Sequence, residues 1–380
     1  MVRRGMAQRA AARRFRRALH TVQRWVARAG EQRLDRVNWD DRAPIAKTIH
    51  RTDRATEDLI LMLRQELKDV SDLGEYGARA IHDALTARGC GTIPAERTIG
   101  RILERRGAFD GQRRVRRPAP PRGWYLPEVA CQRAELDTFD FVQGLVIQGG
   151  FDVEVLTGTA LHSGLIGAWP GPPFTARVTL DHLLTHWRQV GLPDYAQFDN
   201  DTRFQGPHQY RGVISRVMRA CLSLQVVPVF TPVNEPAFQA ALENLNGRWQ
   251  SKVWSRFHHD SYAALRERSD RYVTASRQRA ARRVESAPRR RPFPADWQLA
   301  LQAPPHGLVI FLRRTTDRGT ITMLGESFDV DGTWPHRLVR AEVDLDAGYI
   351  RFYALRRRTP DEQPLLREIA YRPPARSFTD

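Results

Sequence analysis

Two arginine- and proline-rich stretches interrupt this 380-residue chain and constrain how it can be divided into domains. The first runs from Arg113 to Arg122 and contains three prolines, and the second, at 288–305, contains five. Proline lacks a backbone N–H and cannot continue a helix or an inner strand. We therefore expect basic linkers at 111–130 and 276–305, with separately folded domains on either side of each.

Two groups of helices are predicted before the first linker. Residues 7–30 carry a helical pattern in two pieces, which predicts a partial helix-turn-helix and a connector over residues 1–50. Residues 51–110 contain a clearer pair of helices, from Tyr76 to Arg88 and from Pro94 to Arg106, separated by a glycine-containing break. This layout predicts a helix-turn-helix DNA-binding domain.

The second helix of that pair has one apolar side, so its polar side chains are expected to face outward, as they do in a recognition helix. An ordinary helical hairpin with a solvated basic face is the alternative interpretation. The predicted DNA contacts on this helix are Arg97, Thr98, Arg101 and Arg105.

Strand patterns dominate the rest of the chain. Residues 131–275 begin with short apolar segments separated by glycines, followed by a helix over 175–190 and a strand over 195–198. This order predicts a mixed α/β sheet covered by helices. Residues 306–372 show short alternating segments between turn residues, which predict a small antiparallel β-barrel.

The charge of the chain indicates a polyanionic partner. The formal net charge is +17, and all but three of the 60 basic residues are arginines, whose planar guanidinium suits phosphate oxygens. Codon bias in a GC-rich genome is an alternative reason for arginine over lysine, but it does not explain the net charge. Nucleic acid is therefore the expected partner.

The sequence shows no pattern typical of a membrane span, a secretory signal or a zinc site. No apolar run reaches the roughly 20 residues that cross a bilayer, and the arginine-dense start does not resemble a secretory signal, so we expect a cytoplasmic protein without membrane contact. Three distant cysteines lack zinc-site spacing and are expected to be reduced thiols.

Three carboxylates, far apart in the sequence, are candidates for phosphodiester chemistry, which uses divalent cations on both sides of the scissile phosphate. Asp137 lies in an apolar strand, where an uncompensated charge is costly; it would hold a metal or pair with an arginine. By strand alternation, Asp140 would point to the opposite face. Asp199 directly follows the apolar strand that ends at Phe198, so it is expected at the edge of the sheet.

Glu243 is the third candidate. It lies on a helix predicted from about 237 to 254, on a polar strip with Asn246 beside the apolar stripe. The strip could direct a carboxylate at the sheet or could be solvated. Glu235, in the preceding loop, is the rival third ligand.

These residues resemble the motifs of the DDE integrase and transposase superfamily. Glu135-Leu136-Asp137-Thr138 is similar to the first-strand motif, and Phe174-Thr175-Ala176 to the start of the helix before the second acid. Gly191-Leu192-Pro193 followed by the stretch from Phe198 to Phe204 resembles the second-acid motif. The stretch from Thr231 through Pro236, then Glu243 and Asn246, resembles the third.

The resemblance implies a multidomain α/β protein with an RNase H-like catalytic core, N-terminal helix-turn-helix modules and a C-terminal small β-barrel, as in bacterial insertion-sequence transposases. It implies that Asp137, Asp199 and Glu243 bind two Mg²⁺ or Mn²⁺ ions for DNA strand cleavage and transfer. It further implies double-stranded DNA as partner, assembly of at least a dimer, and association with the bacterial nucleoid. Asn246 would orient Glu243 or contact DNA, and Arg248 and Lys252 would contact phosphates.

The sequence departs from the family in three places. Asp201 stands where the family has glycine, Gln239-Ala240 replaces an asparagine-glycine pair, and the spacing from Asp199 to Glu243 is longer than usual, whereas Glu235 would match it. Two alternatives therefore stay open: a catalytically inactive DNA-binding protein acting as a regulator or assembly factor, and another RNase H-like nuclease that cuts without joining.

Overall fold

The computed structural model describes residue 2 and residues 5–39, 52–108, 122–206, 211–233, 235–356 and 362–374. The chain divides into two compact units, Met1–Thr56 and Glu57–Asp380. Among the described residues, no helix combines the length and the apolar character needed to span a membrane.

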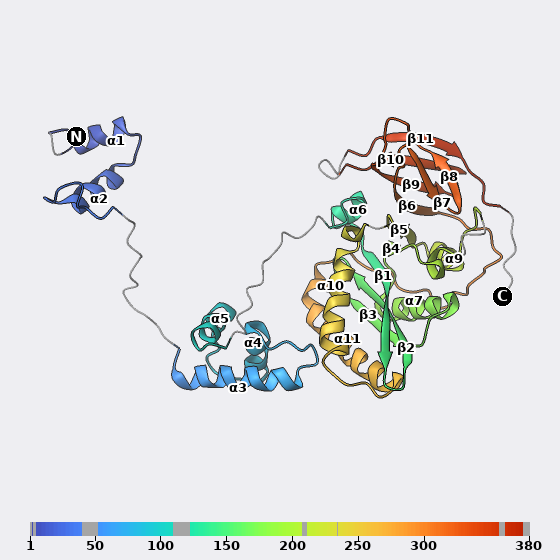
Figure 1. Cartoon of the computed structure of the whole chain (residues 1–380), viewed down its shortest axis with the longest axis horizontal. Coiled ribbons are helices and arrows are strands. Elements are labelled where there is room, and N and C mark those ends of the chain that lie inside the picture. Colours follow the sequence, from blue (N-terminus) through green and yellow to red (C-terminus); the bar gives the residue numbers. More distant parts are fainter. Residues whose placement is uncertain are drawn as a thin grey trace. The chain divides into compact units, whose positions relative to one another are not determined.

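The first unit contains the helices α1 (Gln8–Arg14) and α2 (Leu19–Ala29), as the two-piece pattern predicted (Figure 1). Its buried apolar residues are small, namely Ala11, Ala12, Ala29 and Val37. The predicted connector around Asp40 to Pro44 lies outside the described residues.

Three helices precede the first linker in the second unit: α3 (Arg54–Val70), α4 (Ala78–Ala87) and α5 (Glu96–Arg105). They surround a small apolar core to which each contributes, for example Ile60, Ile81 and Ile99. The predicted helix pair is therefore confirmed as two helices, with slightly later starts, while its role in DNA binding stays a prediction.

The first predicted linker, at 111–130, extends into residues that pack on the sheet. Residues 109–121 lie outside the described residues, but 122–130 are ordered against the sheet and end in α6 (Pro127–Ala130). Trp124, Tyr125 and Leu126 are buried, because their apolar side chains pack with Phe238 and the strands beside it. The linker therefore ends before Trp124 rather than at residue 130.

A nine-stranded mixed sheet forms the centre of the second unit, with the order β11-β10-β9-β6-β5-β4-β1-β2-β3. The strands β1, β4, β5 and β6 run parallel, and the other neighbours pair antiparallel. The strands are β1 (Leu136–Ile147), β2 (Phe151–Ala160), β3 (Ile166–Gly171), β4 (Tyr195–Phe198), β5 (Val227–Phe230), β6 (Leu308–Arg314), β9 (Leu338–Asp344), β10 (Tyr349–Ala354) and β11 (Leu365–Ala370).

The strands predicted to form a separate barrel continue this sheet instead. Val229 and Phe230 of β5 pair with Ile310 and Phe311 of β6, so the apolar edge of β5 is covered by residues from beyond the second linker. A separate two-stranded sheet is formed by β7 (Thr320–Met323) and β8 (Glu326–Asp329). The second linker also begins later than expected, because helix α11 (Tyr262–Glu285) runs through the predicted boundary at residue 276.

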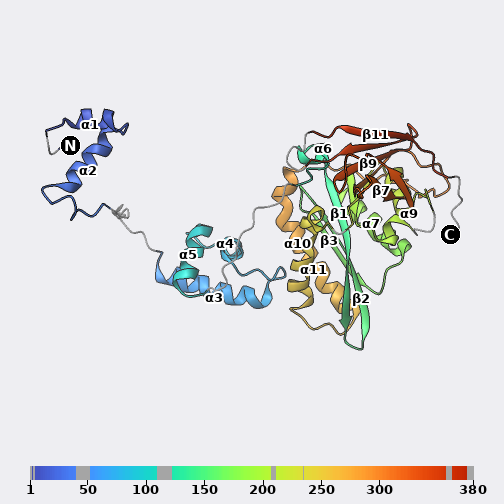
Figure 2. The ribbon, with the colours of Figure 1, turned by 45° about the horizontal axis from the view of Figure 1, so that its top comes forward.

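Helices cover both faces of the sheet, as Figures 1 and 2 show. On one face, α7 (Ala176–Val190), α8 (Thr202–Gln205) and α9 (Arg216–Ser223) pack with Phe139 and Phe198. On the other, α10 (Ala240–Trp249), the π-helical turn η3 (Gln250–Trp254) and α11 pack with Val142 and Val155. The short 3-10 turn η2 (Pro236–Phe238) leads from β5 into α10.

Candidate active site

Asp140, inside β1, and Asp199, directly after β4, lie side by side where the parallel pairing of these strands ends. Phe139 of β1 is in register with Phe198 of β4, so the residue that follows each phenylalanine is an aspartate at the same level of the sheet. The sequence predicted Asp199 at this edge, but it assigned Asp137, rather than Asp140, as its partner.

Burial and like charge raise the pKa of both aspartates. Burial raises the pKa of Asp140 to about 6, with further contributions from the charges of Asp201 and Glu243. Burial, and then the charge of Asp140, raise the pKa of Asp199 to about 7. These carboxylates therefore repel one another when ionised, a condition that a bound cation relieves.

Glu243 approaches the pair from α10, where its side chain is exposed. The neighbouring Asn246 faces the sheet: the Thr157 hydroxyl donates to its Oδ1 at 2.7 Å. Thr157 is the cross-strand partner of Asp140, and its hydroxyl also lies 3.2 Å from the Asp140 carbonyl oxygen. This contact fixes the turn of α10 that carries Glu243 against the strand that carries Asp140.

Asp137 has a different environment. Its side chain is buried, and both carboxylate oxygens accept hydrogen bonds from Arg290, at 2.8 and 2.6 Å. Trp187 of α7 donates a third, at 3.0 Å. These contacts agree with the alternative expectation that Asp137 pairs with an arginine. They occupy the carboxylate oxygens that a metal ion would need. The role of Asp137 as a metal ligand stays a prediction that this geometry does not support.

Asp201, which departs from the family pattern, is also neutralised. It begins helix α8 by accepting from the backbone N–H of Arg203 at 2.8 Å. The Arg203 guanidinium then binds both Asp201 oxygens, at 2.8 and 2.6 Å, and also donates to Glu154 at 2.6 Å. Coulombic attraction and these hydrogen bonds outweigh burial, so the pKa of Asp201 is lowered.

The rival third acid, Glu235, forms an ion pair with Arg314 of β6. Its carboxylate is thereby directed toward the strands beyond β5, whereas Glu243 is close enough to Asp140 to raise its pKa. The geometry thus favours Glu243 over Glu235.

The predicted DNA contacts are dispersed. On α5, Arg97 and Arg101 are exposed and Thr98 is half-buried, while Arg105 forms an ion pair with Glu57 of α3. Arg248 is exposed on α10. Lys252, the other predicted phosphate contact in this region, donates from Nζ to the Gly74 carbonyl oxygen at 3.1 Å. Their contacts with DNA stay predictions.

The sequence did not assign Asp140 to the candidate site, whereas the structure places it beside Asp199. Alternation on β1 correctly separated Asp137 and Asp140 onto opposite faces, but it could not tell which face carries the site. Among the described residues, no three His, Cys, Asp or Glu side chains already form a cluster that could hold a metal ion. The donor chemistry nonetheless fits one, because carboxylate oxygens are the preferred ligands of Mg²⁺ and Mn²⁺.

No protein-family model and no curated protein matches the chain. Among solved structures, it is similar to a chain of the simian T-cell lymphotropic virus intasome in complex with the PP2A regulatory subunit B56 gamma, with 14% identity over 71% of this chain and 87% of that one (TM-score 0.32). It is also similar to the magnesium-bound HTLV-2 integrase catalytic core, with 12% identity over 36% and 82% (TM-score 0.26). The BIV integrase catalytic core matches with 14% identity over 37% and 81% (TM-score 0.28).

Proposed function

We propose that this chain is a metal-dependent polynucleotidyl transferase of the integrase and transposase type, which cleaves DNA strands and joins them to a target. The observation that carries the proposal is that Asp140 and Asp199 lie side by side, from two parallel strands, and that the charge of Glu243 on α10 contributes to the raised pKa of Asp140. Within the part of the chain that the structure describes, none of the three forms an ion pair, whereas the nearby Asp137 and Asp201 are each paired with arginine.

The three carboxylates would hold the metal ions. Two divalent ions bound there would supply Lewis-acid stabilisation of the attacking and leaving oxygens of a phosphodiester. Asp140 and Asp199 would contribute ligands from the sheet and Glu243 from α10, while Asn246 and Thr157 hold that helix in position. The first acid of the family pattern is thus proposed to be Asp140 in place of Asp137.

Double-stranded DNA is the proposed substrate. The net charge of +17 favours binding to phosphates, and the exposed Arg97 and Arg101 of α5 lie where a recognition helix would use them. The proposal includes the helix-turn-helix role of α4 and α5, the RNase H-like character of the core, and assembly of at least a dimer, since joining two DNA ends requires two active sites.

Mutation of the carboxylates tests the proposal. In a plasmid nicking and strand-transfer assay with Mn²⁺ or Mg²⁺, Asp140→Asn, Asp199→Asn and Glu243→Gln should each lower the rate at least about 100-fold, because metal ions supply several kcal/mol of transition-state stabilisation. Glu235→Gln should lose less than Glu243→Gln. Glu267→Gln, an exposed carboxylate of α11, is the matched control and should keep the wild-type rate.

Two outcomes would oppose the proposal. Wild-type cleavage rates in Asp140→Asn would exclude Asp140 as the first acid. DNA binding by the wild-type chain without metal-dependent cleavage would instead favour the catalytically inactive DNA-binding protein.

A further inference from the structure

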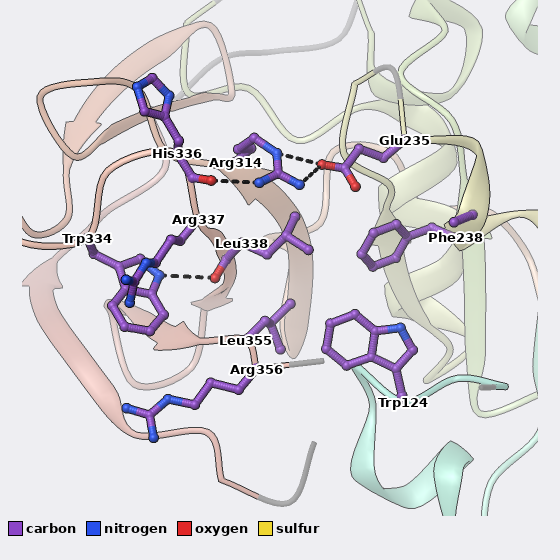
Figure 3. Close-up of a pocket in the computed structure, with 11 residues that line it drawn as sticks. Trp124, Glu235, Phe238, Arg314, Trp334, His336, Arg337, Leu338, Leu355 and Arg356 are labelled. Carbon is purple, nitrogen blue, oxygen red and sulfur yellow. Dashed lines mark hydrogen bonds and ion pairs between the residues drawn. The ribbon is translucent and has the colours of Figure 1, made fainter. Parts of the chain in front are cut away.

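A cavity of about 470 Å³ lies beside the turn η2, between the segment of Trp124 and the strands β6 and β9 (Figure 3). Trp124 and Phe238 form one side, Leu338 and Leu355 lie between, and Trp334 lies across from them. Binding sites for small molecules commonly measure roughly 300–1,000 Å³, so the cavity is large enough for a single nucleotide.

The aromatic walls of the cavity are held in place. The indole N–H of Trp334 donates to the Leu338 carbonyl oxygen at 3.2 Å, which fixes the ring while leaving it half-buried. Trp124 packs on Phe238 with their ring centroids 5.8 Å apart. A flat aromatic ligand would therefore meet rings that are already oriented, which lowers the entropic cost of binding.

Three arginines line the cavity, and one of them, Arg356, is paired with Glu362 at 3.1 Å. Arg314 is neutralised by Glu235 and donates to the His336 carbonyl oxygen at 2.6 Å. Arg337 is exposed, and its guanidinium lies over the Trp334 ring, 4.5 Å from the centroid. An aromatic face with an arginine beside it suits a base and its phosphate.

A second cavity, of about 360 Å³, lies next to this one, because Ala237 and Phe238 line both cavities. It is lined by Thr138 and Gln197, which precede Asp140 and Asp199 by two residues on the same strands. Residues two apart on a strand share a face, so this cavity lies on the side of the sheet that carries Asp140.

The second cavity contains a polar group that is suited to a ligand. The side-chain nitrogen of Gln239 is buried, and no hydrogen-bond acceptor is found for it among the described residues. A buried N–H donor without an acceptor is costly, and an oxygen of a bound DNA strand would relieve that cost. The second cavity thus offers a polar donor next to the aromatic cavity, on the other side of Ala237 and Phe238.

We propose that the aromatic cavity binds an unpaired nucleotide of the DNA substrate, with its base against Trp334 and its phosphate at Arg337. This inference rests on the proposed function, because it names the form of DNA that the same site receives: a strand end that is frayed or single-stranded next to the duplex.

The test compares two labelled DNA probes that share one duplex sequence, one blunt and one with a short single-stranded thymidine overhang. Affinities are measured by fluorescence anisotropy with the full chain in EDTA, so that no cleavage intervenes. Trp334→Ala should weaken binding of the overhang probe about 5- to 150-fold, the range for loss of base stacking, and leave the blunt probe unchanged. Trp334→Phe, which keeps a ring, should retain most of the affinity.

The matched control is Tyr349→Ala, which removes an exposed aromatic ring with its own arginine, Arg351, from β10 outside the cavity. It should bind both probes like the wild type. If Trp334→Ala fails to fold, Arg337→Ala at the exposed rim provides the same comparison and should also weaken the overhang probe selectively.

Two results would overturn this inference but not the proposed function. One is an equal loss of affinity for both probes, and the other is unchanged binding of the overhang probe by Trp334→Ala and Arg337→Ala. Failure of the wild-type chain to bind either probe would overturn the proposed function as well.

Discussion

Asp137 and Asp140 lie three residues apart on β1 and have opposite electrostatic surroundings. Asp137 is 1% exposed and receives two hydrogen bonds from Arg290, and attraction by Arg290 outweighs burial to lower its pKa. Burial raises the pKa of Asp140, and the nearby charges of Asp201 and Glu243 raise it further. One carboxylate thus belongs to the structural core, while the other is available for a cation.

This difference predicts opposite effects of the same substitution. Asp137→Asn should lower the free energy of unfolding by about 3–5 kcal/mol, because it leaves Arg290 buried without its counter-charge. Asp140→Asn should leave the metal-free protein at least as stable as the wild type, since it removes like-charge repulsion. Urea denaturation followed by circular dichroism measures both, and similar losses in the two variants would contradict the assignment.

Asp199 makes the stability of the metal-free site depend on pH. Its pKa is raised from 3.8 to about 7 in the folded protein, so the stability linked to its neutral form is complete below pH 3.8 and is lost as the pH rises through 7. Asp199→Asn cannot ionise. It should match the wild type near pH 4 and become more stable than it by about 1.4 kcal/mol for each pH unit up to about pH 7, with no further change toward pH 8.

Thermal unfolding of the two proteins in EDTA between pH 4 and pH 8 measures this difference. Added Mg²⁺ should reduce it at pH 8, because the ion stabilises the ionised carboxylate of the wild type. A stability difference that stays constant with pH would show that Asp199 does not have a raised pKa.

At the scale of the elements, local patterns in the sequence predicted most helices and strands. The helix over 175–190 begins where Thr175 caps it by accepting from the Val178 N–H, and the strand at 195–198 ends just before Asp199. Helical periodicity and short apolar runs are local properties, so they can be read without knowledge of the partners.

Pairing between distant elements could not be predicted in the same way. The choice of Asp137 over Asp140 required knowing that α7 and Arg290 cover one face of β1 while α10 covers the other. The neutralisation of Asp201 likewise depends on the orientation of Arg203 in α8. Asp199 and Glu243 could be chosen as candidates from the sequence because their positions, after a strand and beside the apolar stripe of a helix, are local features.

At the scale of the whole molecule, the sheet crosses the boundary that the prolines suggested. Ile310 and Phe311 of β6 are buried beside Val229 and Phe230 of β5. Val339, Ala341 and Val343 of β9 belong to the same apolar core as Phe139 and Phe198. The segment after residue 305 is therefore part of the same folded sheet and apolar core.

Truncation distinguishes a continuous sheet from an attached domain. A chain ending at residue 305 should lose cooperative unfolding and expose β5, because each large buried side chain contributes about 1.5–3 kcal/mol against a total stability of about 5–15 kcal/mol. Deletion of residues 1–50, which lie in the other compact unit, is the control and should leave the main thermal transition in place. A truncated chain that melts cooperatively near the full-length temperature would instead show that the strands beyond residue 305 form an independent domain, and that the pairing of β5 with β6 contributes little to the stability of the site.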